Sequence, residues 1–313
     1  MRPSTASKTA LSTSLMRALH TRADTYPIIN DPWGDRLVPE SAREGVRQRA
    51  LSAAATSEDS IAEASSDAII DAWLRASPAY ATVVTRSRYA EDALHLAVAR
   101  GVRQYVLIGA GFDSYALRTP MEARHIDIYD VDHPATQTFK RQRIEECGLS
   151  LRNSVYFVAA DLSTESLASV LAKSPFDSTK PAFFSWLGVT MYLSREANLV
   201  SLLAIAQSSA PGSELVFTYL DTEAFRAEPD SAPKALSVIR RSVASIGEPF
   251  LSAFDPRTLA DDLRGVGFEL EEDLDDFQLV DRYDPRGLNG LKAAKLSHIA
   301  HARMTGISEH GAA

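Results

Sequence analysis

The chain has 313 residues, of which 45% are hydrophobic, so it can form one large domain with added elements around a substantial core. Its formal net charge of −8 argues against a nucleic-acid partner, because phosphate binding needs concentrated lysine and arginine. The single cysteine, Cys147, excludes an internal disulfide and a cysteine-rich metal site, and we expect no metal. Without a signal-peptide core or an apolar segment of membrane-spanning length, the sequence predicts a cytoplasmic protein with no membrane partner.

The N-terminal third of the sequence predicts a helical cover that includes a lid. We assign the whole cover to residues 1–100 and expect it to pack on the core. The predicted helices are 9–22, 68–77 and 78–101. Between the first two, the prolines of 26–39 favour an ordered loop, and its apolar side chains need burial, as in a lid. The alanine- and serine-rich residues 51–68 predict chain that is mobile or weakly helical.

From residue 101 onward, short apolar runs alternate with helical patterns, which is typical of an α/β fold with a parallel sheet covered on both faces. The expected strands are 104–110, 124–132, 154–161, 181–188, 213–220, 267–274 and 296–304. The expected helices between them lie near 113–121, 134–147, 164–173, 194–208 and 256–264. The segment at about 221–250 exceeds a simple crossover and contains a helical stretch, so we expect an inserted helix within a ligand-binding domain of residues 101–313.

The stretch "YVLIGAGFDSYALR" places a Gly-Ala-Gly turn directly after the first predicted strand. Gly109 and Gly111 allow backbone to approach a ligand closely. Asp132 and Asp161 end the next two strands, where carboxylates can bind a ribose diol and an adenine amine. The dinucleotide-binding motif has a third glycine three residues after the second, but Ser114 occupies that position here. The residues alone leave a nicotinamide cofactor and S-adenosylmethionine both open.

Seven motifs occur in a fixed order: "SKTALSTSLMRA", "NDPWGDRLV", "TRSRYAEDAL", "LIGAGFDSYALR", "DVDHPATQTFKRQRI", "AADL" and "WLGVTMYL". Together they resemble the leucine carboxyl methyltransferase family, within it the bacterial branch of S-adenosylmethionine-dependent O-methyltransferases of actinobacteria and some polyketide pathways. The resemblance runs from about Ser7 to about Arg303. It implies the class I methyltransferase fold: a Rossmann-like, seven-stranded, mostly parallel sheet with an antiparallel last strand, an N-terminal helical cover and a helical insertion.

The resemblance also implies S-adenosyl-L-methionine as the cofactor and assigns its contacts. By that likeness Arg86 pairs with the methionine carboxylate and Asp132 binds the ribose. By the same likeness, Gly109 and its neighbours Ala110 and Gly111 lie against the ligand. Asp161 and Leu162 contact the adenine. Three positions depart from the family pattern: Leu187 replaces a glutamate near the methionine tail, Tyr115 replaces an arginine, and Asp130 replaces a glutamate conservatively.

For the other substrate we expect a small-molecule methyl acceptor. The candidate pocket residues are Tyr115, Trp186, Tyr192 and Tyr219, and the candidate catalytic groups are His133 and Tyr192. Core packing is the alternative for the aromatic residues, and helix capping is the alternative for His133 and both aspartates.

The expected reaction is O-methylation of a carboxylate on a small metabolite, such as a polyketide of secondary metabolism. A carboxylate is already ionised near neutral pH and needs no general base. The open alternatives are a phenolic or hydroxyl acceptor, a nicotinamide-dependent oxidoreductase, and a non-catalytic ligand-binding protein of the same fold.

Overall fold

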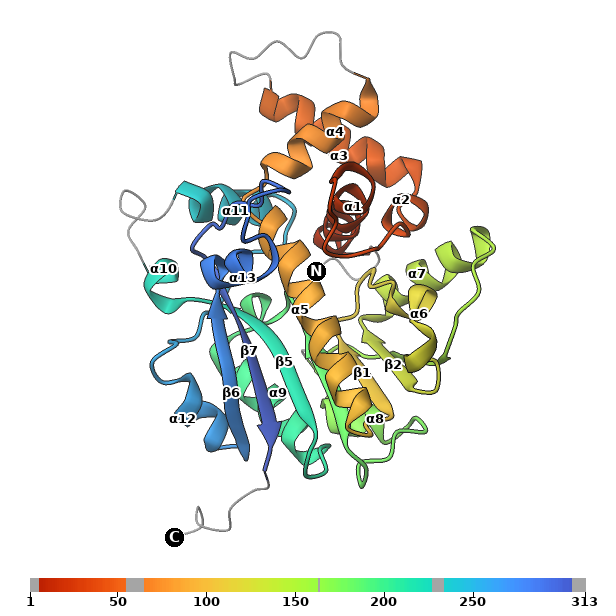
Figure 1. The fold of residues 1–313 in the computed structure, drawn as a ribbon, viewed down its shortest axis with the longest axis vertical. Coiled ribbons are helices and arrows are strands. Elements are labelled where there is room, and N and C mark those ends of the chain that lie inside the picture. Colours follow the sequence, from red (N-terminus) through yellow and green to blue (C-terminus); the bar gives the residue numbers. More distant parts are fainter. Residues whose placement is uncertain (1–5, 55–64, 163, 227–233, 306–313) are drawn as a thin grey trace.

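A computed structural model describes residues 6–54, 65–162, 164–226 and 234–305 of the chain, and its centre is one sheet (Figure 1). The strands are β1 Gln104–Ile108, β2 Asp127–Asp132, β3 Ser154–Ala159, β4 Ala182–Trp186, β5 Glu214–Leu220, β6 Phe268–Asp275 and β7 Ser297–Met304. Their order is β3-β2-β1-β4-β5-β7-β6, and the first five are mutually parallel. β7 runs antiparallel to both neighbours. The predicted seven-stranded sheet with an antiparallel last strand is confirmed.

Helices cover both faces of this sheet, as expected for parallel strands joined by crossovers. The N-terminal helices are α1 Lys8–Ala23, α2 Gly34–Leu37, α3 Glu40–Ala54, α4 Ser66–Ala76 and α5 Tyr80–Ala99. Those between strands are α6 Tyr115–Arg118, η1 Met121–Ala123, α7 Pro134–Glu146, α8 Leu167–Leu171, η2 Thr190–Tyr192 and α9 Arg195–Gln207. The remainder are α10 Thr222–Arg226, α11 Lys234–Ser245, α12 Leu259–Arg264 and α13 Asp276–Tyr283.

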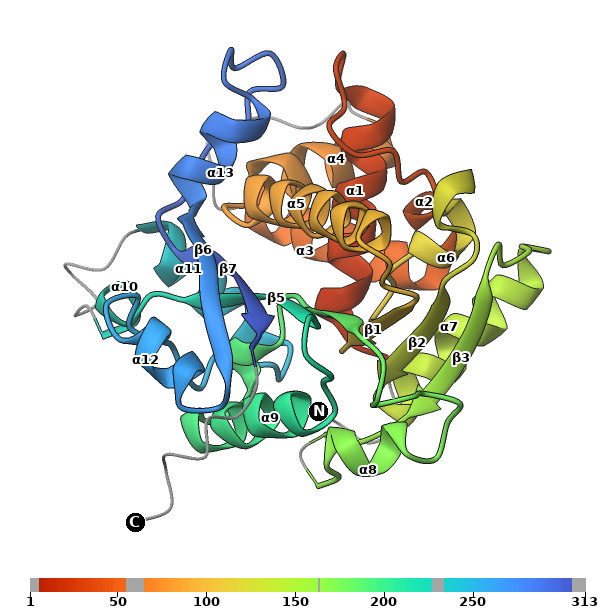
Figure 2. The same cartoon turned by 60° about the horizontal axis from the view of Figure 1, so that its bottom comes forward.

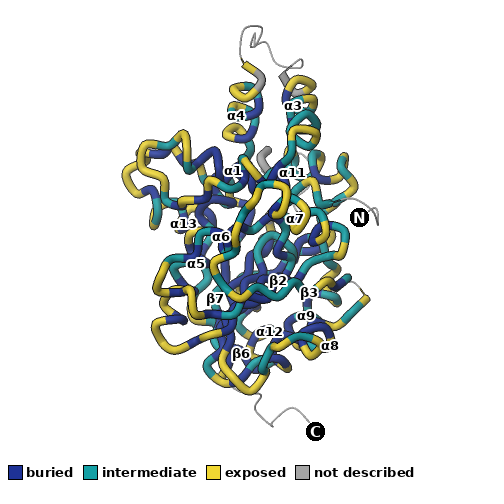
Figure 3. Tube along the Cα trace, turned by 90° about the vertical axis from the view of Figure 1, so that its right-hand side faces the viewer, coloured by how far each residue is buried: buried dark blue, intermediate teal, exposed yellow. Residues whose placement is uncertain are grey.

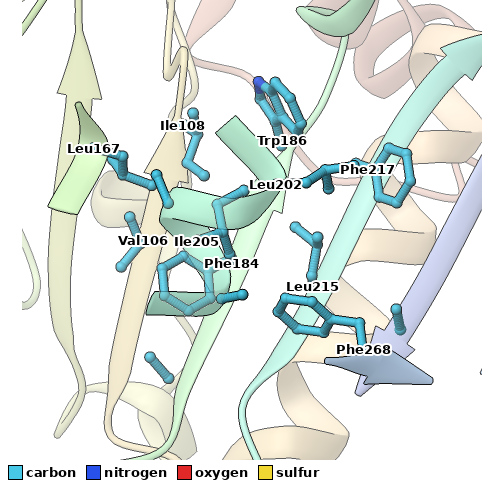
Figure 4. Close-up of a cluster of buried hydrophobic side chains, with 14 of the residues drawn as sticks. Val106, Ile108, Leu167, Phe184, Trp186, Leu202, Ile205, Leu215, Phe217 and Phe268 are labelled. Atoms are coloured by element: carbon cyan, nitrogen blue, oxygen red, sulfur yellow. The ribbon is translucent and has the colours of Figure 1, made fainter. Parts of the chain in front are cut away.

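One core lies between the sheet and α8, α9 and α12 (Figure 4). There Leu202 and Ile205 of α9 pack on Phe184 and Leu215 of the central strands. A second core lies on the opposite face, under α5, α6 and α13. Every residue of β4 and β5 is buried, because helices cover both faces of the sheet at its centre.

The helices α1 to α4 lie beyond the carboxyl ends of the parallel strands, where α1, α4 and the start of α5 share a third apolar cluster (Figures 1 and 2). α1 and α2 approach closely at Gly34, where an added methyl group would lie 2.1 Å from the carbonyl oxygen of Ser14. Figure 3 shows α3 and α4 projecting from the body of the molecule. This layer is positioned to cover ligands bound at the strand ends.

Several expectations about elements need correction or addition. The loop expected over 26–39 includes the short helix α2, and the sequence did not predict α3 or α13 as helices. The inserted helix is present as α11. Residues 55–64, part of the stretch expected to be weakly helical, lie outside the described residues. Within the described ranges, no helix combines the length and apolarity needed to cross a bilayer.

Candidate active site

The turn after β1 is built around two glycines with positive φ, 66° at Gly109 and 51° at Gly111. The amides of Gly109 and Ala110 both donate to the carbonyl of Val131 on β2, at 2.9 and 3.1 Å. A methyl group on Gly109 would lie 2.5 Å from Cγ2 of Val189. A side chain at Gly109 would therefore need both a strained positive φ and a shift of Val189.

Asp132 ends β2 beside this turn. Its carboxylate accepts hydrogen bonds from the amide of Gly111 and from the amide of His133, the latter at 2.6 Å. Burial raises the pKa of Asp132 to about 6, although the two backbone donors act in the opposite direction. A carboxylate at this position can accept hydrogen bonds from a ligand's hydroxyl groups in its ionised form.

Asp161 and Leu162 follow β3 at the same edge of the sheet. The amide of Ala160 donates to the carbonyl of Asp132 at 2.9 Å, which holds this segment beside the end of β2. The backbone carbonyl of Asp161 accepts from the amides of Thr164 and Glu165, and Leu162 packs against the core. The structure thus brings the turn after β1, Asp132 and Asp161 together, because the carboxyl ends of parallel strands meet at one edge.

A cavity of about 280 Å³ opens between the N-terminal layer and the inserted helix. We call it the cover cavity: it is enclosed by α1, the end of α4, the start of α5, η2 and α11. Arg86 of α5 contributes to its lining, and its guanidinium packs against Gly188, where an added methyl group would lie 2.7 Å from Nη2. Burial lowers the pKa of Arg86 to about 10. Arg86 forms no hydrogen bond or ion pair with any described residue, so it is available to an anionic ligand.

The rest of the described lining is apolar or carries hydroxyl groups. Its large apolar members include Met16, Trp73, Met191, Leu236, Ile239 and Phe250. Arg49 and Arg86 are its only charged residues, and it contains no histidine, aspartate, glutamate, lysine or cysteine among the residues that the structure describes. The cavity therefore combines apolar walls with positive charge, in a chain whose net charge is negative.

The first turn of α1 closes one side of the cavity. The amide of Lys8 donates to Glu248 Oε1 at 3.2 Å, and the Thr9 hydroxyl donates to the other oxygen of the same carboxylate. On the opposite side, an added methyl group on Gly111 would lie 3.0 Å from Cβ of Ala10. One helical turn therefore contacts both the glycine turn and the end of the insertion.

Of the residues expected in the acceptor pocket, only Tyr192 lines this cavity. Its ring lies 5.5 Å from that of Phe250, and burial raises its pKa to about 12. Trp186 and Tyr219 are fully buried in the core, and the Tyr219 hydroxyl donates to Asp273 at 2.7 Å. Tyr115 is also buried, with its hydroxyl 3.1 Å from a ring nitrogen of His95. The expectation for these three residues is corrected, because their side chains face the cores rather than the cavity.

His133, the other candidate catalytic group, does not line the cavity. Its Nδ1 accepts the amide of Ala135 at 3.3 Å, so it acts as the N-cap of α7. Leu187, at the position of the family glutamate, packs against the apolar cluster under α5. Sequence reasoning did not find Arg49, Thr9 or Trp73 in the lining, since no motif marks them.

This arrangement, a glycine turn with acidic strand ends under a helical cover, defines a class I methyltransferase. The leucine carboxyl methyltransferase family model matches residues 10–206, and the chain belongs to that family. A Bacillus subtilis relative named "Putative S-adenosyl-L-methionine-dependent methyltransferase YktD" is 29% identical over 96% of this chain and 99% of its own. A Mycolicibacterium smegmatis relative with the same class of name is 30% identical over 84% of this chain and 83% of its own.

Solved structures share the fold. A DUF574 family protein from Streptomyces avermitilis aligns with a TM-score of 0.54 at 16% identity, covering 93% of this chain and 97% of that one. A methyltransferase structure from Thermobifida fusca aligns with a TM-score of 0.52 at 18% identity, covering 83% and 94%. The protein is an S-adenosylmethionine-dependent methyltransferase, which sets aside the nicotinamide-dependent oxidoreductase and the non-catalytic binding protein.

The residues present fit this cofactor. An arginine with no partner among the described residues suits a carboxylate, and a partly desolvated aspartate at a strand end suits a pair of hydroxyls. The absence of a phosphate on the ligand agrees with a turn that lacks the third glycine of a dinucleotide site.

Proposed function

We propose that this enzyme methylates a carboxylate oxygen of a small organic acid, a class that includes acidic polyketides. The observation that carries the proposal is the described lining of the cover cavity, which offers two arginines and no general base. An acceptor that arrives already ionised fits such a cavity, because its charge is attracted and no proton has to be removed.

The cofactor contacts in this proposal come from four places in the chain. Arg86 pairs with the methionine carboxylate, the 109–111 turn lies against the ligand, Asp132 accepts from the ribose hydroxyls, and Asp161 with Leu162 holds the adenine. When bound, S-adenosylmethionine supplies an electrophilic methyl group on a sulfonium, whose carbon–sulfur electron pair stays with sulfur as the acceptor oxygen takes the methyl. The protein's own part is orientation and exclusion of water.

A phenol or alcohol acceptor fits this cavity less well. A phenol has a reference pKa of about 10 and gains from a positioned base. The one ionisable acid in the described lining is Tyr192, and burial raises its pKa to about 12, so it is protonated at neutral pH and a poor base. His133 is occupied as a helix cap outside the cavity.

The test uses S-adenosylmethionine with an isotopic label on the methyl group, offered with matched sets of aliphatic acids, phenols and alcohols. We expect label to enter the acids as methyl esters, which release labelled methanol in mild alkali, whereas aryl and alkyl ethers do not. Methyl esters of the same acids serve as controls and should accept no label. Alkali-stable label in phenols or alcohols, with none in acids, would overturn carboxylate methylation.

A further inference from the structure

Two arginines share a property that separates them from the others. Among the described arginines that are not exposed, Arg49 and Arg86 alone form neither a hydrogen bond nor an ion pair with another described residue. Both line the cover cavity. In the proposed function Arg86 pairs with the carboxylate of the cofactor, whereas Arg49 adds positive charge to the cavity but has no assigned partner.

Arg49 enters the cavity from the cover. It lies on α3, and its guanidinium carbon is 5.8 Å from the centre of the Trp73 ring of α4, a cation–π contact. Arg86 instead packs against Gly188, directly after β4. Figure 1 shows α3 and α4 at the top of the molecule, away from the strands, so the two cations reach the cavity from different sides.

Three described acidic residues of α3 and α4 already have other partners. Glu40 and Glu44 on the same helix both pair with Arg47. Asp71 on α4 pairs with Arg22 at 2.6 Å. Burial lowers the pKa of Arg49, and no charge among the described residues compensates. A guanidinium desolvated in this way gains more from an incoming anion than a surface arginine would.

We propose that Arg49 binds a second anionic group of the acceptor, so that the substrates are amphipathic diacids: an apolar body with one acidic group at each end. One carboxylate receives the methyl group and the other anionic group, a carboxylate or an equivalent oxyanion, forms a forked pair with Arg49. The apolar body lies against walls such as Met16, Trp73 and Ile239. The inference rests on the proposed function for the identity of the methylated group, but not for the anion site itself.

The test measures binding, without requiring turnover. The enzyme is saturated with S-adenosylhomocysteine and titrated by calorimetry with octanedioate, decanedioate and dodecanedioate, and with the monocarboxylates of equal length. We expect at least one diacid to bind about tenfold or more tighter than its monoacid, since a pair with a charged group is lost in the latter. Arg49→Met keeps the apolar stem and should abolish this preference, and Arg49→Lys should restore part of it.

Arg47→Met is the matched control. It removes a neighbouring arginine of α3 that is paired with glutamates and does not line the cavity, so the preference should persist. Melting temperatures of all variants check that each is folded. Equal binding of diacids and monoacids at every length, or an unchanged preference in Arg49→Met, would overturn the proposal. A diacid preference that depends on Arg49 without formation of any methyl ester would keep the anion site and overturn carboxylate methylation instead.

Discussion

Asp132 is buried beside the glycine turn, so its ionisation responds to what binds there. Burial raises its pKa from 3.8 to about 6, and ribose hydroxyls would stabilise the charged form. We predict that affinity for S-adenosylhomocysteine is constant above about pH 7 and falls by up to about tenfold per unit below about pH 6. Calorimetry across this range, in buffers of different ionisation enthalpy, measures both the affinity and the proton released on binding.

The Asp132→Asn variant separates ligand binding from a purely structural role, in which the carboxylate only holds the amides of Gly111 and His133. Its affinity should be lower and independent of pH between 5 and 8, because an amide does not titrate. The raised pKa also means that the contribution of Asp132 to the unfolding free energy has a downward slope as pH rises from about 4 to about 6, since the folded state binds the proton more tightly. That slope should disappear in the variant. Unchanged affinity with altered stability would assign Asp132 only to holding the glycine turn.

Arg86 gives a second prediction at this scale. Arg86→Ala should weaken S-adenosylhomocysteine binding by about tenfold or more, through loss of a charge-assisted pair with the methionine carboxylate. Arg86→Lys should recover only part, because an ammonium cannot form the fork. Adenosine lacks the carboxylate, so its dissociation constant is the internal control and should not change. An equal loss for both ligands would show that the substitution disturbs the fold rather than the pair.

The sequence was sufficient to find residues whose place follows from strand ends. Asp132 and Asp161 lie together because parallel strands finish at one edge, which spacing alone predicts. It was not sufficient for Trp186 and Tyr219, because a position near a strand end does not determine which face of the sheet receives the side chain. Arg49 lies in "GVRQRA", and nothing in that string distinguishes it from its paired neighbour Arg47. Its cavity exists only once α3, α4 and α11 are packed.

At the scale of elements, the contact between α1 and the end of the insertion predicts a lid. Glu248 accepts the Lys8 amide and the Thr9 hydroxyl at the N-terminus of α1, where a negative charge is also favoured by the helix dipole. Glu248→Ala should speed hydrogen exchange of the amides in the first turn of α1 by about tenfold, as two hydrogen bonds are lost. Mass spectrometry of peptides from residues 6–20 measures it.

Glu196→Ala is the control for this variant, since it removes an exposed carboxylate from the first turn of α9. Exchange in α1 should then match the wild type. If Glu248→Ala leaves the α1 amides as protected from hydrogen exchange as in the wild type, the first turn is held by its apolar contacts and not by the Glu248 carboxylate.

Periodicity predicted the strands and most helices but was weak at the connections. α13 follows β6 without a break, and the prediction of a strand at 267–274 did not use the capping box between Asp275 and Gln278 that begins this helix. α3 has little amphipathic contrast along its length, so hydrophobic periodicity did not mark it, although alanine and arginine favour helix. Packing against α4 selects the helix, and that contact is long-range information that a local pattern does not contain.

For the whole molecule, the central question is whether the cover and the sheet domain fold as one unit. Asp31 is completely buried between them and pairs with Nε of Arg17 at 2.8 Å. Arg17 also donates to the carbonyl of Phe112, next to the glycine turn, at 2.8 Å. Arg118 of α6 lies 3.9 Å from Asp31 and forms a forked pair with Glu91 of α5. The cover is therefore joined to the cofactor edge by charge as well as by apolar packing.

Asp31→Asn tests this connection. Burial alone would raise the pKa of Asp31, but Arg17 and Arg118 outweigh it and the pKa lies below its usual value, so the carboxylate is stabilising at neutral pH. Its loss leaves Arg17 buried without a counter-charge, and we predict a decrease of about 3–5 kcal/mol in the unfolding free energy. Asp35→Asn, which breaks more exposed pairs with Arg22 and Arg43, should cost about 1 kcal/mol or less.

Denaturant unfolding at pH 7, followed by far-ultraviolet circular dichroism and by tryptophan fluorescence, measures both variants. Fluorescence reports on both parts, because Trp33 and Trp73 lie in the cover and Trp186 lies in the sheet. If the two parts fold as one unit, the wild-type protein and Asp31→Asn should each unfold in one transition that coincides for the two probes. The difference between them should shrink as pH falls below about 4, where protonation removes the native ion pair. An earlier, separate transition of the cover in the wild type would show that the N-terminal layer folds independently, and the buried ion pair would then serve only to close it over the ligand.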